Sequence, residues 1–402
     1  MKLRPSVKEA MRQLHVKKLK KNLIKPINAI LDGHDALVIA PMSYGRSLLY
    51  QIPAVVQKDA MTIVVEPSPA LIHDQVQKLQ KHGIPAACLD SAQSESNRND
   101  VINAMHSGEV QILYLASEQL RIDILSWIEE SNKIGIIVVD ECHCAASWGQ
   151  IFRDAYLAIG KYIDQMKQHP VVVALSAAIL PEDRPNIITR LSMRNVKTFR
   201  MSLYQSNLRF VKRMTPSRMA QLKELKRCLK KYRKHMSIVV CSTEEHAEGV
   251  AGELRKKYQD DVILYHGQDN RQEKATLSDR RHIIVAASAL STGVDVRNVD
   301  LVIHYNMPVS LADYYQMASR AGCEGQEARS ILLYNPDDYN TNRALLHDIG
   351  DKAVRKAMLA SLNEMKRFCE DEKHCMVRTM LQALGDSYDH NCRYCTNCQR
   401  RK

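Results

Sequence analysis

The sequence predicts an α/β fold of two domains in tandem, each with a parallel β-sheet, followed by a small helical subdomain. Short β-branched runs alternate with helix-length stretches along most of the chain, and they fall into two series. Strands that alternate with helices pair in parallel, because each helix carries the chain back across one face of the sheet. After Pro336 the pattern becomes helical and ends in a cluster of cysteines.

Ten apolar runs are the expected strands. The first series covers residues 36–40, 62–66, 111–115, 136–139 and 171–175, and the second covers 237–241, 262–265, 282–286, 301–304 and 331–334. Short runs that are apolar throughout are typical of strands buried on both faces. Strand signals lapse over residues 199–213, which indicates the join between the two domains. We therefore expect domains at 1–200 and 201–345 and a subdomain at 346–402.

Composition places the chain among ordinary globular proteins. It has 402 residues, 45% of them hydrophobic and 25% charged, which is enough for two or three domain cores. No apolar run approaches the roughly 20 residues of a membrane span, and no apolar segment follows Met1–Pro5 as in a secretory signal. We expect no membrane partner and no secretion, and hence a cytoplasmic protein in a bacterium or a nuclear one in a eukaryote. Since thiols stay reduced there, Cys88, Cys228 and Cys241 are predicted core residues.

The chain carries a formal net charge of +12, which predicts a polyanionic partner such as nucleic acid. A generically basic surface would give the same charge. Five of the basic residues are lysines within residues 17–25, but leucines and an isoleucine are spaced among them. That spacing favours an ordinary solvated helix face over a dedicated DNA-binding arm.

A phosphate-binding loop is predicted between the strand at 36–40 and a helix that begins near Ser47. In such loops glycines let backbone N–H groups approach the phosphates, a lysine reaches the terminal phosphates, and a hydroxyl binds Mg²⁺. Ser43, Gly45 and Ser47 are candidate contacts, and Arg46 stands where the lysine is usual. Arginine keeps the positive charge but is a planar fork instead of a compact ammonium. The alternative is a strand–turn–helix without a ligand.

Asp140 and Glu141 come directly after the apolar run at 136–139 and are followed by Cys142 and His143. Two adjacent carboxylates at the carboxyl end of a buried strand suit Mg²⁺-nucleotide chemistry. One can hold the metal through its water shell, and the other can orient an attacking water. Together with the loop, they predict an ATP site that uses Mg²⁺.

An aromatic segment follows the acidic pair. Trp148, Phe152, Arg153 and Tyr156 lie within nine residues, although the chain has only two tryptophans and four phenylalanines. Such a group can stack on and clamp single-stranded bases. Packing in a core is the alternative.

The C-terminal cysteines have the spacing of a zinc site. Cys392, Cys395 and Cys398 form two overlapping C-x₂-C units, and tetrahedral zinc needs a fourth ligand. The residues that could supply it are Cys369, His374, Cys375 and His390. Four closed ligands indicate a structural Zn²⁺ that stabilises a tail too small for its own core.

The chain resembles the RecQ family of DExH-box DNA helicases. The matching segments occur in the family's order and run from about residue 20 to the end. They are Ser47–Ala54, Asp74–Val76, Cys88–Ser91, Asp140–His143, Ser147–Gly149 with Phe152 and Arg153, and Tyr314–Gln316 with Arg320–Gly322. The segment Trp-Gly-x-x-Phe-Arg beside a DExH box is characteristic of that family.

The resemblance implies two RecA-like domains with ATP between them, DNA across the top, and a zinc-binding subdomain. It implies ATP-dependent 3′–5′ unwinding of DNA in recombination and repair. We expect single-stranded or forked DNA as the partner and a monomer as the oligomeric state. Its further implied site residues are catalytic His143 and Arg320, nucleotide-binding Gly293 and Asp295, and Cys375 as the fourth zinc ligand. No winged-helix domain is expected within this sequence.

Departures from the family pattern fall on the ATP contacts. Leu23 stands where the family has a glutamine that recognises adenine, and Arg46 replaces the lysine of the phosphate loop. Ala178 replaces the threonine of the motif that couples hydrolysis to DNA, and Cys323 stands where the arginine finger is expected. The aromatic segment also has Gln150–Ile151 where His-Asp is usual. Since an arginine finger contributes about 10³ to 10⁵ in rate, we expect impaired hydrolysis. An active helicase, a DNA-binding pseudo-helicase that acts as a scaffold or regulator, and a protein that has left nucleic acid altogether are the three hypotheses.

Overall fold

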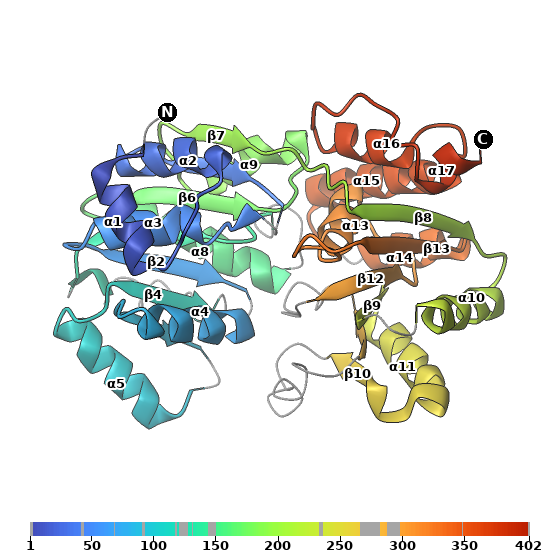
Figure 1. Ribbon diagram of the computed structural model, residues 1–402, viewed down its shortest axis with the longest axis horizontal. Helices are drawn as coiled ribbons and strands as arrows, with labels where there is room; N and C mark the ends of the chain where they lie inside the picture. The colour runs from blue at the N-terminus through green and yellow to red at the C-terminus, as the bar shows by residue number, and fades with distance from the viewer. Residues whose placement is uncertain are drawn as a thin grey trace. The chain divides into compact units, whose positions relative to one another are not determined.

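The computed structural model describes most of the chain and divides it into two compact units, Met1–Met201 and Ser202–Lys402 (Figure 1). Each unit is built on its own parallel sheet. The described residues are 3–41, 44–67, 69–90, 93–116, 119, 128–130, 132–143, 150–232, 236–265, 282–287, 298–347 and 349–400.

Unit 1 contains a seven-stranded sheet in the order β3-β4-β2-β5-β6-β1-β7, and its strand pairs are parallel. Its inner strands are buried along their whole length, as expected for a sheet covered on both faces. The strands are β1 (Ala36–Ile39), β2 (Met61–Glu66), β3 (Ala86–Leu89), β4 (Ile112–Ala116), β5 (Ile134–Val139), β6 (Val171–Ser176) and β7 (Lys197–Arg200).

Helices of unit 1 bury their apolar stripes against this sheet. Side chains from α1, α2 and α3, among them Val7, Ile27 and Ile52, share one core with the inner strands. Asp35 ties the start of β1 to its neighbours, because its carboxylate accepts the N–H groups of Val172 and Arg194. The helices are α1 (Pro5–Gln13), α2 (Lys21–Leu31), α3 (Leu48–Val56), α4 (Pro69–Lys81), α5 (Glu95–His106), α8 (Gln150–Gln165), the 3₁₀ turn η3 (Pro181–Asp183) and α9 (Arg184–Arg190).

Unit 2 contains a six-stranded parallel sheet in the order β10-β11-β9-β12-β13-β8. Its strands are β8 (Leu208–Met214), β9 (Met236–Cys241), β10 (Val262–Tyr265), β11 (Ile283–Ala287), β12 (Val299–His304) and β13 (Ala328–Tyr334). Its helices are α10 (Arg218–Lys231), α11 (Glu244–Tyr258), the 3₁₀ turn η4 (Gln259–Asp261), α13 (Leu311–Ala318), α14 (Asp337–His347), α15 (Lys352–Glu370), α16 (Met376–Ala383) and α17 (Thr396–Gln399).

The ten strands predicted from the sequence are confirmed, and the structure adds β3, β7 and β8. The division between the two units, after Met201, falls within residues 199–213 as expected, but β7 ends and β8 begins in this range, where no strand was predicted. β7 is an edge strand whose residues are mostly exposed, and β8 alternates buried with half-buried positions, so neither forms the continuous apolar run of an inner strand. The core placement of Cys88, Cys228 and Cys241 is confirmed, because all three are buried.

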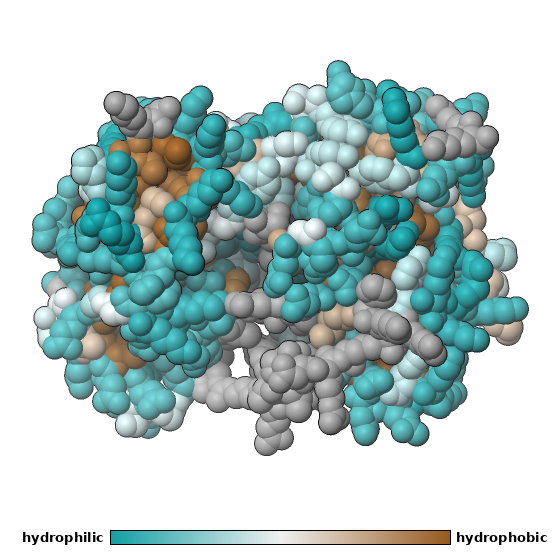
Figure 2. Space-filling model, viewed as in Figure 1, coloured by the Kyte–Doolittle hydropathy of each residue, from teal (hydrophilic) through white to brown (hydrophobic). Residues whose placement is uncertain are grey.

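The surface fits the composition. Figure 2 shows a face that is mostly hydrophilic over both units, with apolar side chains in smaller groups between the polar ones. Lysines 17, 18, 20, 21 and 25 are all exposed, but only the last two belong to a helix, α2. Among the described residues, no helix combines the length and apolar character that crossing a membrane requires.

Candidate nucleotide site and zinc centre

The predicted phosphate loop joins β1 to α3. Gly45 has a φ of +75°, in the left-handed region that favours glycine, and its carbonyl accepts the N–H of Leu48 at the start of α3. This turn directs the next residue, Arg46, back over the end of the sheet. Ser47 caps α3 without a side-chain hydrogen bond to the helix. Ser43 lies outside the described residues.

The acidic pair sits on a tight turn at the carboxyl end of β5. The N–H of Asp140 donates to Val65 O on β2, and the N–H of Cys142 donates to Leu175 O on β6. Between them Glu141 has a φ of +49°, and its N–H donates to Asp140 Oδ1 at 2.8 Å. A non-glycine residue keeps this conformation only where its surroundings fix it. The two flanking strands therefore hold both carboxylates at one edge of the sheet.

Arg46 is paired with this turn. Its Nη2 lies 2.5 Å from Glu141 Oε1 and 3.5 Å from Asp140 Oδ1, and the three side chains are 6–8% exposed. Burial alone would lower the pKa of Arg46, but the carboxylates of Asp140 and Glu141 together raise it. Burial raises the pKa of Asp140 to about 6 despite the nearby guanidinium. Arg46 is therefore within ion-pair distance of both carboxylates, and Glu141 is the nearer one.

His143 contacts the other side of Glu141. Its Nδ1 lies 3.4 Å from Glu141 Oε2 and 3.0 Å from Ser176 Oγ, and Ser176 in turn donates to the Ala178 carbonyl. Because the serine hydroxyl is the donor to Ala178, Nδ1 of the imidazole carries the proton. Burial lowers the pKa of His143, so the ring is neutral. The acidic turn is thereby linked to the segment after β6, where the family's coupling threonine is expected.

Tyr156 is hydrogen-bonded to the backbone of the acidic turn. Its ring, on α8, is fully buried, and its hydroxyl donates to the Asp140 carbonyl at 3.2 Å. A fully buried ring offers no face to a base, so this geometry favours packing over the predicted DNA contact at this position. Trp148 lies outside the described residues. Phe152 and Arg153 lie on α8, but their side chains are outside the described part.

Two buried groups at this site, Glu66 and Ser176, were not predicted from the sequence. Glu66 ends β2, the strand beside β5, and its charge helps raise the pKa of Arg46. A carboxylate that closes an apolar strand next to the acidic strand was the available signal. Ser176, at the end of β6, contacts His143, and only its place after an apolar run could have indicated this role. Leu23, at the expected adenine-reading position, lies in the core on α2.

The predicted residues of the second domain are only partly described. Arg320 is 6% exposed just after α13, and its N–H donates to Met317 O. Cys323, three residues further on, is partly exposed. Gly293 and Asp295 lie outside the described residues.

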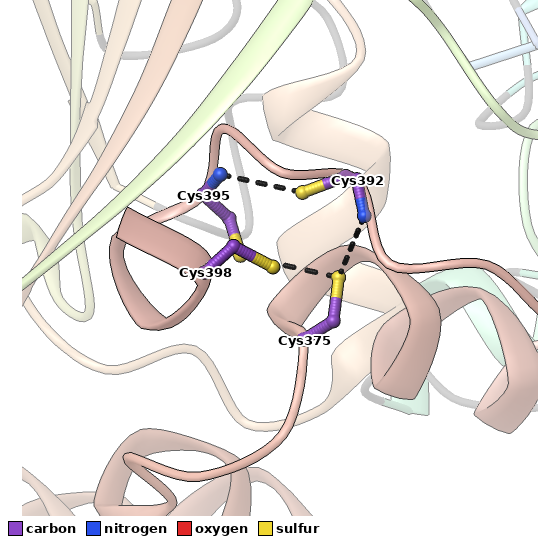
Figure 3. A group of neighbouring side chains, drawn as sticks. All are labelled: Cys375, Cys392, Cys395 and Cys398. Atoms are coloured by element: carbon purple, nitrogen blue, oxygen red, sulfur yellow. Dashed lines mark hydrogen bonds between the residues drawn. The ribbon is translucent and has the colours of Figure 1, made fainter. Parts of the chain in front are cut away.

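The zinc ligands come together from two segments of unit 2. The Sγ atoms of Cys375, Cys392, Cys395 and Cys398 lie within 4.8 Å of one another, and their side chains converge on one point (Figure 3). Cys375 and Cys395 cap α16 and α17. Backbone N–H groups donate to two of the sulfurs, Cys375 Sγ and Cys392 Sγ, each at 3.3 Å.

This sulfur set fits a tetrahedral zinc ion. Sulfurs bound to one zinc at about 2.3 Å lie about 3.8 Å apart, and Cys395 Sγ is 4.0 Å from Cys375 Sγ. Cys369 is buried in α15, while His374 pairs with Asp371 and His390 with Asp389. None of these three alternatives belongs to the cluster found in the described part of the chain.

Three protein families match the chain in succession. Residues 24–184 match the DEAD/DEAH box helicase family, and residues 220–325 match the helicase conserved C-terminal domain. Residues 336–399 match the RecQ zinc-binding family. The first two matches cover parts of both sheets, and the third covers the four cysteines.

Similar curated proteins are DNA helicases of the RecQ type. The ATP-dependent DNA helicase hus2/rqh1 of Schizosaccharomyces pombe is 31% identical over 94% of this chain and 29% of its own length. The ATP-dependent DNA helicase RecQ of Bacillus subtilis is 30% identical over 90% of this chain and 61% of its own length. The RecQ of Haemophilus influenzae is 28% identical, with 92% and 60% covered. The chain thus spans less than two thirds of each of these relatives.

Solved structures match the fold. The DEAD-box helicase Mss116 bound to single-stranded RNA has a TM-score of 0.69 at 15% identity, with 95% of this chain and 89% of that chain covered. The DUF1998 helicase MrfA bound to DNA has a TM-score of 0.68 at 19% identity, with 85% and 53% covered. At these identities the similarity concerns the fold alone, that of two RecA-like domains.

Proposed function

Because the chain belongs to the RecQ family of DExH-box helicases, we propose that it is a DNA-binding helicase core that binds ATP and hydrolyses it slowly. Its partner is single-stranded or forked DNA, and the direction of any unwinding is 3′–5′. Its domains are residues 1–200 and 201–345, with the zinc-binding subdomain at 346–402. The similarity to ATP-dependent DNA helicases, the net charge of +12 and the phosphate-loop geometry support this proposal.

Each site residue has a proposed role. The backbone around Ser43 and Gly45 and the hydroxyl of Ser47 hold the phosphates and Mg²⁺, and Asp140 and Glu141 hold the metal's waters and orient the attacking water. Mg²⁺ would supply charge neutralisation at the phosphates. His143 positions Glu141. The remaining proposed contacts are Arg320, Gly293 and Asp295 toward the nucleotide, and Trp148, Phe152 and Arg153 toward DNA.

The observation that carries the impaired hydrolysis is the contact between Arg46 and Glu141, at 2.5 Å. For Arg46 to reach phosphates, and for Glu141 to reach a water, this buried pair has to separate. Removing one partner of a buried pair costs about 3–5 kcal/mol, which is an upper bound for this separation before new contacts to the nucleotide are counted. Every 1.4 kcal/mol that is not returned lowers affinity or rate about tenfold.

The second candidate function is a DNA-binding scaffold or regulator without significant ATPase. Cys323 favours it, because a thiol cannot supply the charge that an arginine finger gives to the transition state, worth about 10³ to 10⁵ in rate. DNA binding is common to both candidates.

An ATPase assay with and without single-stranded DNA separates the two functions. Glu141→Gln, which removes the water-orienting carboxylate, is the blank. A slow helicase core hydrolyses ATP above this blank and does so faster with DNA. A rate equal to the blank under both conditions, together with DNA binding, identifies the scaffold. Absence of DNA binding overturns both.

A further inference from the structure

Unit 1 carries a second cluster of metal-ligating side chains, on α4 and at the end of β3. The two ring nitrogens of His73 face different partners. Nδ1 lies 3.7 Å from Cys88 Sγ, and Nε2 lies 2.6 Å from Asp90 Oδ2. No role proposed above for the nucleotide, DNA or the C-terminal zinc uses these three residues.

The cluster is separate from the nucleotide site. β3 is the edge strand of its sheet, and the order β3-β4-β2-β5 places it three strands from the acidic turn. Since neighbouring strands lie about 4.8 Å apart, the two sites are roughly 14 Å from each other. An ion bound at one of them does not touch the other.

The cluster is buried on one side and open on the other. The side chain of Asp90 is fully buried and Cys88 is 6% exposed, whereas the imidazole of His73 is 47% exposed. The site is therefore open to solvent on the side of the imidazole, while the thiol and the carboxylate lie inside the protein. Such an arrangement differs from the closed, all-cysteine set at the C-terminus.

We propose that His73, Cys88 and Asp90 bind one divalent transition-metal ion, of which Zn²⁺ suits the donor set best, with a coordination position left for water. Imidazole nitrogen, thiolate sulfur and carboxylate oxygen are the three ligand types that zinc takes in proteins, and sites with three protein ligands keep an open position. The three ligand atoms already lie within 4.8 Å of one another.

Binding one ion requires the His73 ring to turn, because its two nitrogens now face different ligands. A zinc ion with Zn–S of about 2.3 Å and Zn–N of about 2.0 Å holds its sulfur and nitrogen about 3.5 Å apart. Cys88 Sγ and His73 Nδ1 are 3.7 Å apart. Because an ion takes one ring nitrogen, the carboxylate of Asp90 has to approach Nδ1 as the half-exposed ring turns.

Gln93 holds the floor of the site in place. Its Nε2 donates to the Cys88 carbonyl at 2.8 Å and lies 3.6 Å from Cys88 Sγ, and its Oε1 accepts the N–H of Asp90 at 3.3 Å. Hydrogen bonds of this kind orient ligands and strengthen metal binding. One side chain thus fixes both Cys88, on β3, and Asp90, directly after this strand.

The test uses the full chain with zinc already in its four-cysteine centre, titrated with Co²⁺. Binding to a thiolate gives a sulfur-to-cobalt charge-transfer band, and equilibrium dialysis gives the number of ions bound. The expected result is one further Co²⁺ per chain, with that band. No additional ion, or an additional ion without the band, overturns the proposal.

Variants locate the ion. Cys88→Ser should abolish the band, and His73→Ala and Asp90→Asn should each weaken binding by more than about 100-fold, beyond the roughly 10–100-fold that the loss of an outer-shell partner costs. Cys228→Ser and His34→Ala are the matched controls and should leave it unchanged. If the buried Cys88→Ser or Asp90→Asn variant does not fold, the half-exposed His73→Ala decides, and undiminished binding in that variant contradicts the site.

Discussion

Arg46 and Glu141 are 95 residues apart in the sequence, yet their side chains meet at 2.5 Å in a buried ion pair. The cation of the phosphate loop therefore rests on the carboxylate proposed to orient the attacking water. His143 contacts the second oxygen of the same carboxylate. Any nucleotide has to compete with contacts that Glu141 already makes within the protein.

Removing the guanidinium should destabilise unit 1. Arg46→Ala leaves Asp140 and Glu141 buried without their cation, so the free energy of unfolding should fall by about 3–5 kcal/mol in urea titrations. Arg12→Ala is the control, because its pair with Glu9 is exposed and should contribute about 1 kcal/mol or less. Equal losses of unfolding free energy in the two variants would show that the buried pair stabilises the fold no more than an exposed pair does.

DNA binding should depend on salt and on the aromatic segment. We expect the affinity for single-stranded DNA to fall as salt rises, with a slope that reflects several phosphate contacts. Trp148→Ala and Phe152→Ala should each weaken binding by about 1–3 kcal/mol in fluorescence anisotropy, the worth of one stacked base.

Tyr156→Phe is the control for these two variants. It keeps the buried ring and removes only the hydrogen bond to Asp140, so stability should fall by about 1 kcal/mol without a change in DNA affinity. An affinity that does not depend on salt would contradict the phosphate contacts. Unchanged binding in both the Trp148 and the Phe152 variant would mean that the segment only packs in the core.

Stability should decrease as the pH falls below neutral, because of His304. Burial lowers the pKa of this histidine to about 3, and neither ring nitrogen has a hydrogen-bond partner among the described residues. The unfolded chain takes up its proton near pH 6.5 and the folded chain does not, so stability is complete above pH 6.5 and is lost on acidification toward pH 3.

The loss attributable to His304 should approach about 1.4 kcal/mol for each pH unit below 6.5. Urea midpoints at pH 7.5 and 5.5 measure it, with His304→Phe as the non-titrating comparison. The difference in stability between wild type and this variant should change between the two pH values. A constant difference would mean that His304 titrates normally in the folded chain.

Zinc removal should unfold the zinc-binding subdomain, residues 346–402, and leave unit 1 folded. Four sulfur ligands supply stabilisation that this small segment lacks otherwise, so a chelator should reduce helicity while unit 1 keeps its own unfolding transition. Cys375→Ser should lower the zinc content by one ion per chain. Cys369→Ser, a buried cysteine outside the cluster, should retain that ion, and its loss there would shift the ligand assignment.

The inner strands could be predicted from the sequence because a parallel strand covered on both faces is apolar throughout. The acidic pair could be placed at the carboxyl edge for the same reason, since it follows such a strand directly. β7 and β8 escaped this reasoning, because Lys197–Arg200 is an exposed edge and Leu208–Met214 alternates in burial. Sequence patterns report burial, and these strands are only partly buried.

The contacts within the sites could not be predicted. Nothing local in Arg46 indicates that its side chain turns to Glu141, and Glu66 joins them only because β2 lies beside β5. Spacing alone left four residues open as the fourth zinc ligand, whereas the resemblance indicated Cys375, the one of the four that joins the other sulfurs in the described part of the chain. The assignments of Trp148, Gly293 and Asp295 remain predictions from the resemblance.

The most direct test of the account is the ATPase rate of Arg46→Lys combined with Cys323→Arg, measured at saturating single-stranded DNA. A lysine offers a compact ammonium to the phosphates, and the new arginine restores the charge expected at the transition state. The account predicts a rate at least about tenfold above wild type, abolished by adding Glu141→Gln. A rate no higher than that of the wild-type chain, in a double variant that folds and binds DNA normally, would contradict it.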